Sequence, residues 1–352
     1  MALLKYQNAG ITGITAAVPA NLIDNLSYTD HFENNVVKKI VEKIGIYKRR
    51  FVKDGTCSSD LCYAAAEALF QEMDLDRSKV DMVLFVSQTP DYRMPATSIL
   101  LQHRLGLSRD VIAFDINLGC SAFVFALQTS FSYLQNTGIN KVLILNGETR
   151  SKVYSPKDRK TAFIFGDAGA AILVEKDEKF GNSFFSLNSD GSKSSFIKMD
   201  GGGYRNPSTI EGLREKVVDE YGNIRNDEQG YMDGESVFSF FVNEIPIDIK
   251  RILKFSSMDI RSIDYFVFHQ ASKIVNDYLI RKLKLNSNKV PKSYPDYGNT
   301  SSVSVPLTMV TGLKDKLAKK KILLLSAFGV GFSWASAIIQ TQDCFIGTVT
   351  EI

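Results

Sequence analysis

Cysteine, proline and tryptophan are scarce in this sequence of 352 residues, which contains four Cys, nine Pro and one Trp. The four cysteines have neither a C-x-x-C spacing nor the density of a disulfide scaffold; they are Cys57, Cys62, Cys120 and Cys344. They therefore indicate free thiols in a reducing compartment such as the cytoplasm. We also expect no metal site.

Long apolar runs and an excess of one charge sign are missing too. No stretch of about 18 uncharged apolar residues occurs, and residues 1–21 lack the basic segment and apolar core of a secretory signal. The 42 Lys and Arg against 39 Asp and Glu give a net charge of +3, which by itself does not indicate nucleic-acid binding. We expect a cytoplasmic protein without a membrane or nucleic-acid partner.

What is present is the composition of an ordinary globular protein, with 44% hydrophobic and 23% charged residues, which excludes disordered and fibrous classes. The length fits two packed units of roughly 150 to 200 residues. Short β-branched runs alternate with segments of helical periodicity, which predicts an α/β fold. We predict strands at residues 81–87, 111–116 and 141–145, helices at 96–105 and 121–135, and two strand-like pieces within 162–174.

A polar stretch, residues 188–229, separates the two halves of the chain. A segment of this length without periodicity is usually functional, so we expect it to lie over a site. Beyond it we predict helices at 234–255, at 272–285 and from about 300, and strands at 265–269, 321–326 and 334–340. In each half a strand runs directly into a helix, which indicates two similar α/β halves.

Cys120 follows a buried strand and begins an apolar helix in DINLGCSAFVFAL. The helix N-terminus and its free backbone N–H groups are expected to lower the pKa of a thiol there, which makes Cys120 a candidate nucleophile. The alternative is a buried structural cysteine. The other three cysteines lack such a strand-to-helix turn, and we expect them to be inert.

Two polar side chains further along are candidate partners. His269 ends the strand in DYFVFHQ and opens a helix, at a position where α/β sheets carry ligand chemistry. His31 and His103 lie in charged helical segments and are weaker candidates. Asn299, in DYGNTSSVSVP, is either a helix cap or an amide donor beside His269.

A glycine turn follows these candidates. Gly329 and Gly331, in SAFGVGFSWAS, indicate either a plain hairpin or a turn with aimed backbone N–H groups. The order Cys, His, Asn also occurs in papain-like proteases. Cys120 lies far from the N-terminus and lacks the C-G-[SA]-C-[WY] context of those enzymes, so we reject a protease.

Together the motifs resemble the β-ketoacyl-acyl-carrier-protein synthase III family of the thiolase superfamily. The resemblance covers almost the whole chain in the family's order, through ITGITAAVPANLIDN, IGIYKRRFV, YRMPATSILLQHRLGL, AFDINLGCSAFVFAL, DRKTAFIFGDAGAAILV, YMDGESVFSFFV, HQASKIV, YGNTSSVSVP and AFGVGFSWAS. It implies a thiolase-like α/β fold, a five-layered α-β-α-β-α sandwich. Its two halves would be residues 1–178, with the nucleophile, and 179–352, with the His and Asn. It also implies a homodimer.

The resemblance implies an acyltransferase that joins a short acyl thioester to malonyl-acyl-carrier protein with loss of CO₂ and so initiates fatty-acid synthesis. Cys120 would accept the acyl group as a thioester, and His269 and Asn299 would hydrogen-bond the carbonyl of the malonyl extender. The backbone N–H groups of Cys120 and Val330 would form the oxyanion hole. Met94 and Phe238 would line the acyl pocket.

The family's substrates are thioesters on coenzyme A or phosphopantetheine, and the resemblance implies no tightly bound cofactor. Contacts to coenzyme A or the carrier protein are implied at Lys39, Lys43, Arg159, Lys273, Arg281 and Lys282. A broader basic set adds Lys38, Lys48, Arg49 and Arg50. This set could form a docking face for an acidic carrier protein or simply a solvated surface.

The sequence departs from the family pattern at four positions. Lys39 stands where many members have a Trp that stacks on the coenzyme A adenine. Ile274 replaces an Arg that contacts the carrier protein in the family. Ser239 replaces a Lys that is common there, and Val330 replaces a Gly of the glycine turn. The missing Trp motivates a second hypothesis, that the protein is a relative from a specialised pathway. Such a relative would take its acyl group from a carrier protein, or transfer it to an oxygen or nitrogen acceptor. A third hypothesis, a non-catalytic partner of another ketosynthase, is disfavoured by the intact Cys, His and Asn.

Overall fold

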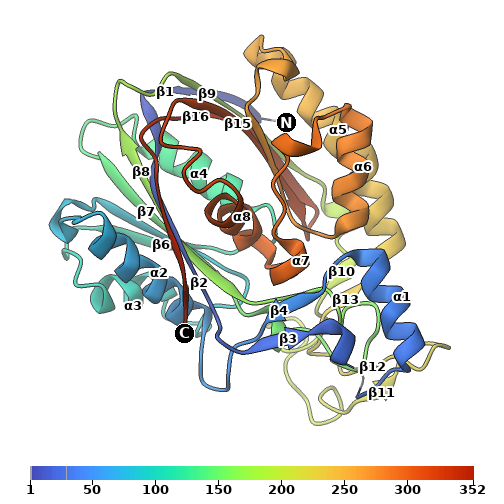
Figure 1. The fold of residues 1–352 in the computed structure, drawn as a ribbon. Helices are drawn as coiled ribbons and strands as arrows, with labels where there is room; N and C mark the ends of the chain where they lie inside the picture. Colours follow the sequence, from blue (N-terminus) through green and yellow to red (C-terminus); the bar gives the residue numbers. More distant parts are fainter. Residues whose placement is uncertain (1, 29) are drawn as a thin grey trace.

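Two main β-sheets organise the described residues, 2–28 and 30–352, of the computed structural model (Figure 1). The six-stranded sheet has the order β17 (Phe345–Glu351), β2 (Ala9–Val18), β8 (Ala168–Lys176), β7 (Lys141–Glu148), β5 (Met82–Val86), β6 (Ile112–Ile116). The five-stranded sheet has the order β1 (Ala2–Gln7), β9 (Asn182–Ser189), β16 (Ser333–Thr341), β15 (Lys321–Gly329), β14 (Tyr265–Phe268). Both mix parallel and antiparallel pairs.

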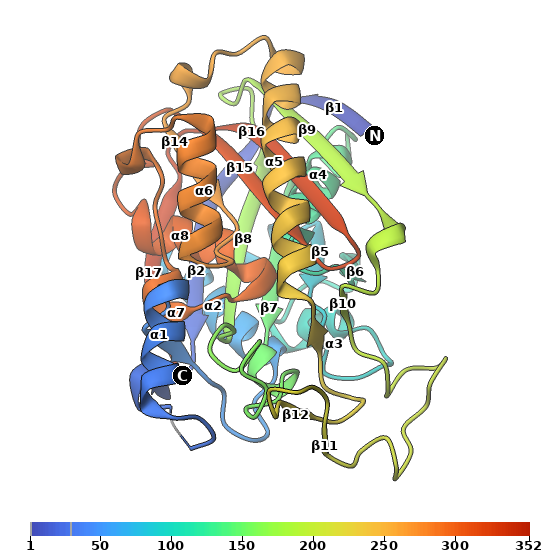
Figure 2. The ribbon, with the colours of Figure 1, turned by 90° about the vertical axis from the view of Figure 1, so that its right-hand side faces the viewer.

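Helices complete a five-layered α-β-α-β-α arrangement, as the sequence predicted. The outer face of the six-stranded sheet carries α2 (Ser58–Glu72) and α3 (Thr97–Arg104). Between the sheets lie α4 (Ala122–Tyr133) and α8 (Ser304–Gly312). The outer face of the five-stranded sheet carries α5 (Gly234–Ser256) and α6 (Lys273–Leu283), which Figure 2 shows in front.

The central layer explains why two helices are apolar on nearly every face. Both sheets cover α4 and α8, so residues such as Phe123, Leu127, Leu307 and Met309 are fully buried. An apolar helix without a polar face has to be enclosed in this way. By contrast α1 (Asn34–Ile44) is amphipathic and lies at the surface, burying Val37 and Val41.

The chain ends cross between the two sheets. β1 pairs with β9 in the five-stranded sheet, whereas β17 pairs with β2 in the six-stranded sheet. Each sheet therefore contains one strand from the opposite end of the chain. Neither pairing was anticipated, because the strands that meet lie far apart in sequence.

Most elements predicted from periodicity are present within a few residues of their expected bounds. The exception is the segment 162–174, which was expected to supply two strand-like pieces but contains a single strand, β8, preceded by turns. Residues 162–167 instead fold back beside the second half, where Phe165 forms an isolated bridge with Asn299.

The polar segment after β9 folds into short strands: β10 (Ile197–Lys198), β11 (Lys216–Val217), β12 (Ile224–Arg225) and β13 (Tyr231–Met232). It packs on the stretch that follows β7. The N–H groups of Ile224 and Gly230 donate to the carbonyls of Lys157 and Val153. The remaining elements are β3 (Leu22–Asp24), β4 (Lys48–Arg50) and α7 (Tyr294–Tyr297). None of the helices in the described part of the chain combines the length and apolar character that a membrane crossing requires.

Candidate active site

Cys120 lies between β6 and α4, where the chain passes from the edge of the six-stranded sheet into the central helix layer. The residue is 9% exposed. Gly329, at the end of β15, approaches so closely that a Cβ there would lie 2.7 Å from the Cβ of Cys120. The thiol is therefore held where the two sheets meet.

The pKa of the Cys120 thiol is raised above its ordinary value of 9.0, and burial is the largest cause. The charge of Arg150 and a hydrogen bond from Ser301 lower it, but they do not offset the burial. The expectation of a net lowered pKa at this helix start is therefore wrong. Removing the thiolate from water outweighs the favourable helix terminus.

His269 follows β14 directly, and its backbone N–H donates to the carbonyl of Ser326 in β15 over 2.9 Å. The residue is 2% exposed, and its ring stands edge-on to Phe328 with the ring centres 5.3 Å apart. Burial lowers the pKa of His269 to about 3, against the opposing effect of a hydrogen bond with the Ser301 backbone. The imidazole is consequently neutral at neutral pH.

The hydrogen bond at Nδ1 orients this imidazole. Nδ1 lies 2.7 Å from the Oγ of Ser304, which also accepts the backbone N–H of Gln270 over 3.3 Å. The Ser304 hydroxyl can therefore donate its own proton to Nδ1, which favours the tautomer with hydrogen on Nε2. That tautomer presents an N–H donor on the other side of the ring.

Asn299 is 6% exposed, and the residue that caps the following 3-10 turn is Thr300 rather than Asn299. The Oδ1 of Asn299 accepts the backbone N–H of Ser301 over 2.9 Å, at the start of this turn, Ser301–Val303. Using Oδ1 in this way leaves the amide N–H₂ as a donor. Gly298 makes the turn possible, because it has φ +70° and a Cβ there would lie 2.8 Å from the carbonyl oxygen of Ile164.

Ser301 contacts all three candidate residues. Its Oγ lies 3.5 Å from the Sγ of Cys120, its N–H donates to the Oδ1 of Asn299, and its backbone raises the pKa of His269 against the effect of burial. It has a left-handed backbone conformation with φ 54°, which is uncommon for a serine. Sequence reasoning missed Ser301, although the run of serines in YGNTSSVSVP was a signal that could have found it.

A buried ion pair lies next to this cluster and was also missed. Glu148, at the end of β7, is 3.7 Å from Arg150 in the following 3-10 turn, and the two side chains are 0% and 6% exposed. The hydroxyl oxygens of Ser301 and Ser302 lie 3.3 Å and 3.2 Å from the Oε1 of Glu148. Burial raises the pKa of Glu148, and the Arg150 charge opposes that effect.

The glycine turn is a hairpin between β15 and β16 that packs on the Cys120 turn. Gly329 pairs with Ser333, and the side chain of Val330 meets Gly119. The hydroxyls of Ser333 and Ser121 lie 2.6 Å apart, which ties the hairpin to the start of α4. The oxyanion role of the Cys120 and Val330 N–H groups stays a prediction.

The two expected pocket residues lie on different elements. Met94 is 75% exposed, in the loop before α3. Phe238, on α5, packs edge-on against Tyr278 of α6 with ring centres 6.2 Å apart. Their assignment to an acyl pocket stays a prediction. Phe328, whose ring stands edge-on to His269, in turn contacts Phe241 of α5.

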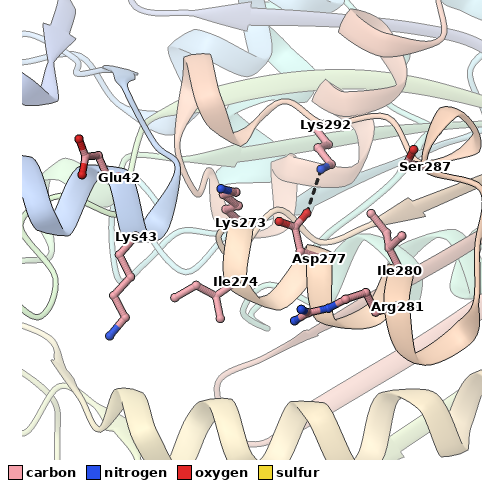
Figure 3. A pocket seen from close by; sticks show the side chains of 9 residues that line it. All are labelled: Glu42, Lys43, Lys273, Ile274, Asp277, Ile280, Arg281, Ser287 and Lys292. Carbon is pink, nitrogen blue, oxygen red and sulfur yellow. Dashed lines mark hydrogen bonds and ion pairs between the residues drawn. The ribbon is translucent and has the colours of Figure 1, made fainter.

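Three of the expected carrier contacts line one surface hollow between α1 and α6 (Figure 3), namely Lys43, Lys273 and Arg281. Ile274 also lines it, and Lys292 bonds Asp277 across it over 3.0 Å. Lys39 and Lys282 are exposed on the same two helices.

Two arginines of the broader basic set do not belong to a docking face. Arg49 is 2% exposed and donates to Asn25 and to the carbonyl of Phe165. Arg50 is half-buried and pairs with Glu351 over 2.7 Å. Both arginines instead bind other parts of the same chain, which their position in a basic stretch of the sequence does not show.

Arg159, the remaining expected contact, has an aromatic neighbour. Its guanidinium lies 4.2 Å from the ring centre of Tyr221, in the polar segment between β9 and α5. Its backbone N–H donates to Asn223 of the same segment. The polar segment therefore packs against residues 153–160, and the expectation that it lies over the site stays a prediction.

Within residues 2–28 and 30–352, no group of three or more His, Cys, Asp or Glu side chains is arranged to hold a metal ion.

Comparison with known proteins identifies the family. The family model described as 3-oxoacyl-[acyl-carrier-protein] synthase III matches residues 114–191, and the model of its C-terminal part matches residues 253–341. A β-ketoacyl-[acyl-carrier-protein] synthase III from Streptococcus agalactiae is 33% identical over 86% of this chain and 90% of its own length. One from Bradyrhizobium diazoefficiens is 30% identical over 94% and 98%. The chain belongs to the β-ketoacyl-acyl-carrier-protein synthase III family.

A solved structure extends this assignment to the fold. The 3-oxoacyl-(acyl-carrier protein) synthase from Burkholderia xenovorans LB400 superposes with a TM-score of 0.93 and 34% identity, and the match covers 99% of both chains. The thiolase-like α/β fold predicted from the motifs is confirmed. At the level of the family, the chain is a ketoacyl synthase, an acyltransferase of fatty-acid biosynthesis.

Proposed function

We propose that this protein condenses a short acyl thioester with malonyl-acyl-carrier protein through an acyl-Cys120 intermediate, and so initiates fatty-acid synthesis. The observation that carries the proposal is the convergence at Ser301, which contacts Cys120, His269 and Asn299. A nucleophile and two neutral hydrogen-bond donors around one buried point fit a carbanion reaction better than they fit hydrolysis. The division into halves 1–178 and 179–352 belongs to the proposal. The nucleophile Cys120 comes from the first half, and the hydrogen-bond donors His269 and Asn299 come from the second.

In the first half-reaction the Cys120 thiolate attacks the carbonyl carbon of the acyl donor. The C–S bond of the donor breaks, and the thiol of its carrier leaves with the proton. Arg150 and the Ser301 hydroxyl favour the thiolate, since both lower the pKa of Cys120. The backbone N–H groups of Cys120 and Val330 hold the oxyanion.

In the second half-reaction the malonyl thioester loses CO₂, and the electron pair of the broken C–C bond forms an enolate. His269 is neutral because burial lowers its pKa to about 3. Its Nε2–H and the amide of Asn299 donate to the enolate oxygen, and preorganised neutral donors stabilise this charge without trapping a permanent ion pair. The carbanion then attacks the acyl thioester and releases the Cys120 thiolate.

Intact-mass spectrometry tests this assignment. Incubation with an acyl-acyl-carrier protein should add one acyl group to the wild-type chain and none to Cys120→Ser. Cys344→Ser is the matched control, because Cys344 is another buried thiol and should leave acylation unchanged. His269→Ala and Asn299→Ala should still acylate but lose condensation by about 100-fold or more. Acylation that persists in Cys120→Ser would refute the proposal.

A second candidate differs in the acyl donor, and one contact favours it. Tyr221 already covers the guanidinium of Arg159 at 4.2 Å, and Lys39 supplies no ring for an adenine. Because the two residues expected to meet coenzyme A offer no free stacking surface, the donor is better matched to an acyl-carrier protein. This fits a specialised-pathway relative, whose acceptor could be carbon, oxygen or nitrogen.

The donor can be determined by labelling. Radiolabelled acetyl-coenzyme A and acetyl-carrier protein are supplied separately, and labelling from the carrier protein alone supports this second candidate. Tyr221→Ala should then increase labelling from acetyl-coenzyme A, whereas Tyr204→Ala, in the same segment beside Arg93, should not. Efficient wild-type labelling from acetyl-coenzyme A would restore the ordinary primer role.

Partners and assembly are part of the proposal. The basic hollow of Lys43, Lys273 and Arg281 supports docking of an acidic acyl-carrier protein. A homodimer is supported by the open edge strand β6 and by exposed apolar side chains beside it, namely Tyr92, Met94, Ile99 and Ile112. Light scattering on dilution should detect the dimer, and Ile112→Glu should weaken it while Ile210→Glu, on a distant exposed segment, should not.

The remaining features are expectations of the same proposal. The four cysteines are free thiols, which supports a reducing compartment such as the cytoplasm. The thioester substrates on coenzyme A or phosphopantetheine bring their own carriers, and the steps above need no tightly bound cofactor. A non-catalytic partner role is disfavoured by the intact Cys, His and Asn and would gain if Cys120→Ser left the cellular function unchanged.

A further inference from the structure

Arg150 is a buried cation with spare hydrogen-bonding capacity. The residue is 5% exposed, and its Nε is buried without a hydrogen-bond partner in the described part of the chain. A guanidinium has five N–H groups. Nη1 donates to the Oε1 of Gln88 over 3.4 Å and Nη2 to the hydroxyl of Tyr154 over 3.2 Å. Both bonds are long, and they engage two of the five donors.

The ion pair with Glu148 does not satisfy these donors. The two side chains are 3.7 Å apart at their nearest, which is beyond hydrogen-bond distance. Other polar groups already lie within hydrogen-bond distance of this carboxylate, namely the backbone N–H of Gln88 and the hydroxyls of Thr89, Ser301 and Ser302. A buried guanidinium that keeps free N–H groups is costly unless another molecule supplies an acceptor.

Arg150 is also close to the reacting atoms. Its charge lowers the pKa of both Cys120 and His269. Gln88, which it contacts, has its Oε1 3.1 Å from where a Cβ on Gly119 would lie, one residue before Cys120. Gln88 therefore links this guanidinium to the turn that carries Cys120.

Aromatic rings form the other side of Arg150. Tyr154 and Phe165 stack with ring centres 4.0 Å apart, and the guanidinium carbon lies 5.4 Å and 5.6 Å from those centres. Phe165 bridges to Asn299, which joins this wall to the site. The surroundings thus combine apolar ring surface with one unsatisfied cation, which suits a short carbon chain carrying one oxygen group.

We propose that Arg150 selects an acyl group that bears an oxygen acceptor, a hydroxyl, oxo or carboxylate oxygen, over an unsubstituted acyl group of the same length. This inference rests on the proposed function, because it requires an acyl group on Cys120. It goes further by naming the substrate class: the oxygen accepts N–H bonds from Arg150 that an alkyl chain leaves unmade. A site with buried donors discriminates strongly against a ligand without the matching acceptor.

The test compares acylation rates of Cys120 with donors matched in length, measured by intact mass. Butyryl-, 3-hydroxybutyryl-, acetoacetyl- and succinyl-carrier proteins are supplied in turn. The wild type should acylate faster with at least one oxygenated group than with butyryl, by about 10-fold to 100-fold. The hydroxyl, oxo and succinyl arms separate neutral from anionic oxygen. Equal rates, or a preference for butyryl, would overturn the inference.

Arg150→Met should abolish this preference. Loss of the cation also raises the thiol pKa and slows every donor, so the readout is the ratio of rates and not their size. Lys152→Met, in the same turn but exposed, is the matched control and should keep the wild-type ratio. If Arg150→Met does not fold, Arg150→Met with Glu148→Gln removes both buried charges, and its ratio is measured instead. A preference that survives in the folded variant also overturns the inference.

The outcomes separate this inference from the proposed function. If no donor acylates Cys120, the proposed function fails. If butyryl and the oxygenated groups acylate it equally, the proposed function stands and the selection by Arg150 fails.

Discussion

Gly329 and Cys120 face each other across the junction of the two sheets, and there is no room for a side chain at Gly329. A Cβ there would lie 2.7 Å from the Cβ and 2.8 Å from the backbone nitrogen of Cys120. The end of β15 therefore fixes the backbone of the residue that we assign as nucleophile. This contact depends on the two halves being correctly packed.

We predict that Gly329→Ala displaces the Cys120 turn. Acylation should slow by about 10-fold or more, because small misplacements of reacting groups are costly, and overpacking should reduce the free energy of unfolding by about 1–3 kcal/mol. Acylation kinetics and urea unfolding measure the two effects. Gly138→Ala, with nothing within 4 Å of the added Cβ, is the control and should change neither. An active, stable Gly329→Ala would contradict the close contact.

Ser301→Ala tests the residue that connects the site. The change removes a hydrogen bond that lowers the pKa of Cys120, so the thiol pKa should rise further and alkylation at a fixed pH should slow by about 5-fold. The pH dependence of iodoacetamide labelling measures the shift. Ser98→Ala is matched to it, since Ser98 is buried with an unpartnered hydroxyl, and its labelling profile should equal that of the wild type.

His269 should make folding stability depend on acid. Its pKa is about 3 in the folded chain and about 6.5 when unfolded, so between these values the unfolded chain binds the extra proton. Stability is fully present above pH 6.5 and falls as the pH falls toward 3. When the pH is lowered from 7 to 5, protonation of this residue in the unfolded chain should lower the free energy of unfolding by about 2 kcal/mol. In urea unfolding, the free energy of unfolding should therefore fall less on acidification in His269→Gln than in the wild type. Equal decreases in the two proteins would refute the lowered pKa of His269.

The same lowered pKa has a consequence for catalysis. Because His269 is neutral throughout the range above about pH 3, the rate of condensation should show no step near pH 6.5 from this imidazole. A pH profile of condensation, recorded on chains already acylated, isolates this step. A rate that falls with an apparent pKa near 6.5 in the wild type and not in His269→Gln would contradict a buried, neutral imidazole.

The basic hollow between α1 and α6 should govern association with the carrier protein. Lys43→Glu combined with Arg281→Glu should raise KM for acyl-carrier protein by about 10-fold and leave kcat nearly unchanged, because the residues line the surface hollow. The wild-type KM should rise with salt, and the variant should respond less. Lys320→Glu, an exposed lysine outside this hollow, is the control. An equal rise in KM for small pantetheine thioesters would argue against docking.

Local patterns were enough to find most elements and the three candidate residues. β5, α3, β6 and α4 follow from alternating and helical periodicity, and the turn motifs around Cys120, His269 and Asn299 are short contiguous segments. The five layers were predicted through the family resemblance. Such features depend on neighbours in sequence, so they can be read without knowing what packs against them.

The tertiary structure decided what depends on distant parts of the chain. The exchange of β1 and β17 between the sheets follows from pairing between strands more than 150 residues apart, such as β1 and β9, in which Ala2 lies opposite Leu187. The direction of the Cys120 pKa shift follows from burial of the thiol, which only the folded chain provides. Arg49 and Arg150 are both buried in the folded chain, which the sequence does not show. Of the two, Arg150 is the one whose charge lowers the pKa of Cys120.

The sequence by itself thus determined the family, the layer pattern and the residue types that the reaction needs. The structure alone decided that Ser301 joins those residues and that an unsatisfied guanidinium lies beside them. The physical reason is that local conformation is encoded by neighbouring residues, whereas burial, and with it protonation and hydrogen-bond satisfaction, arises only when segments from both halves exclude water together.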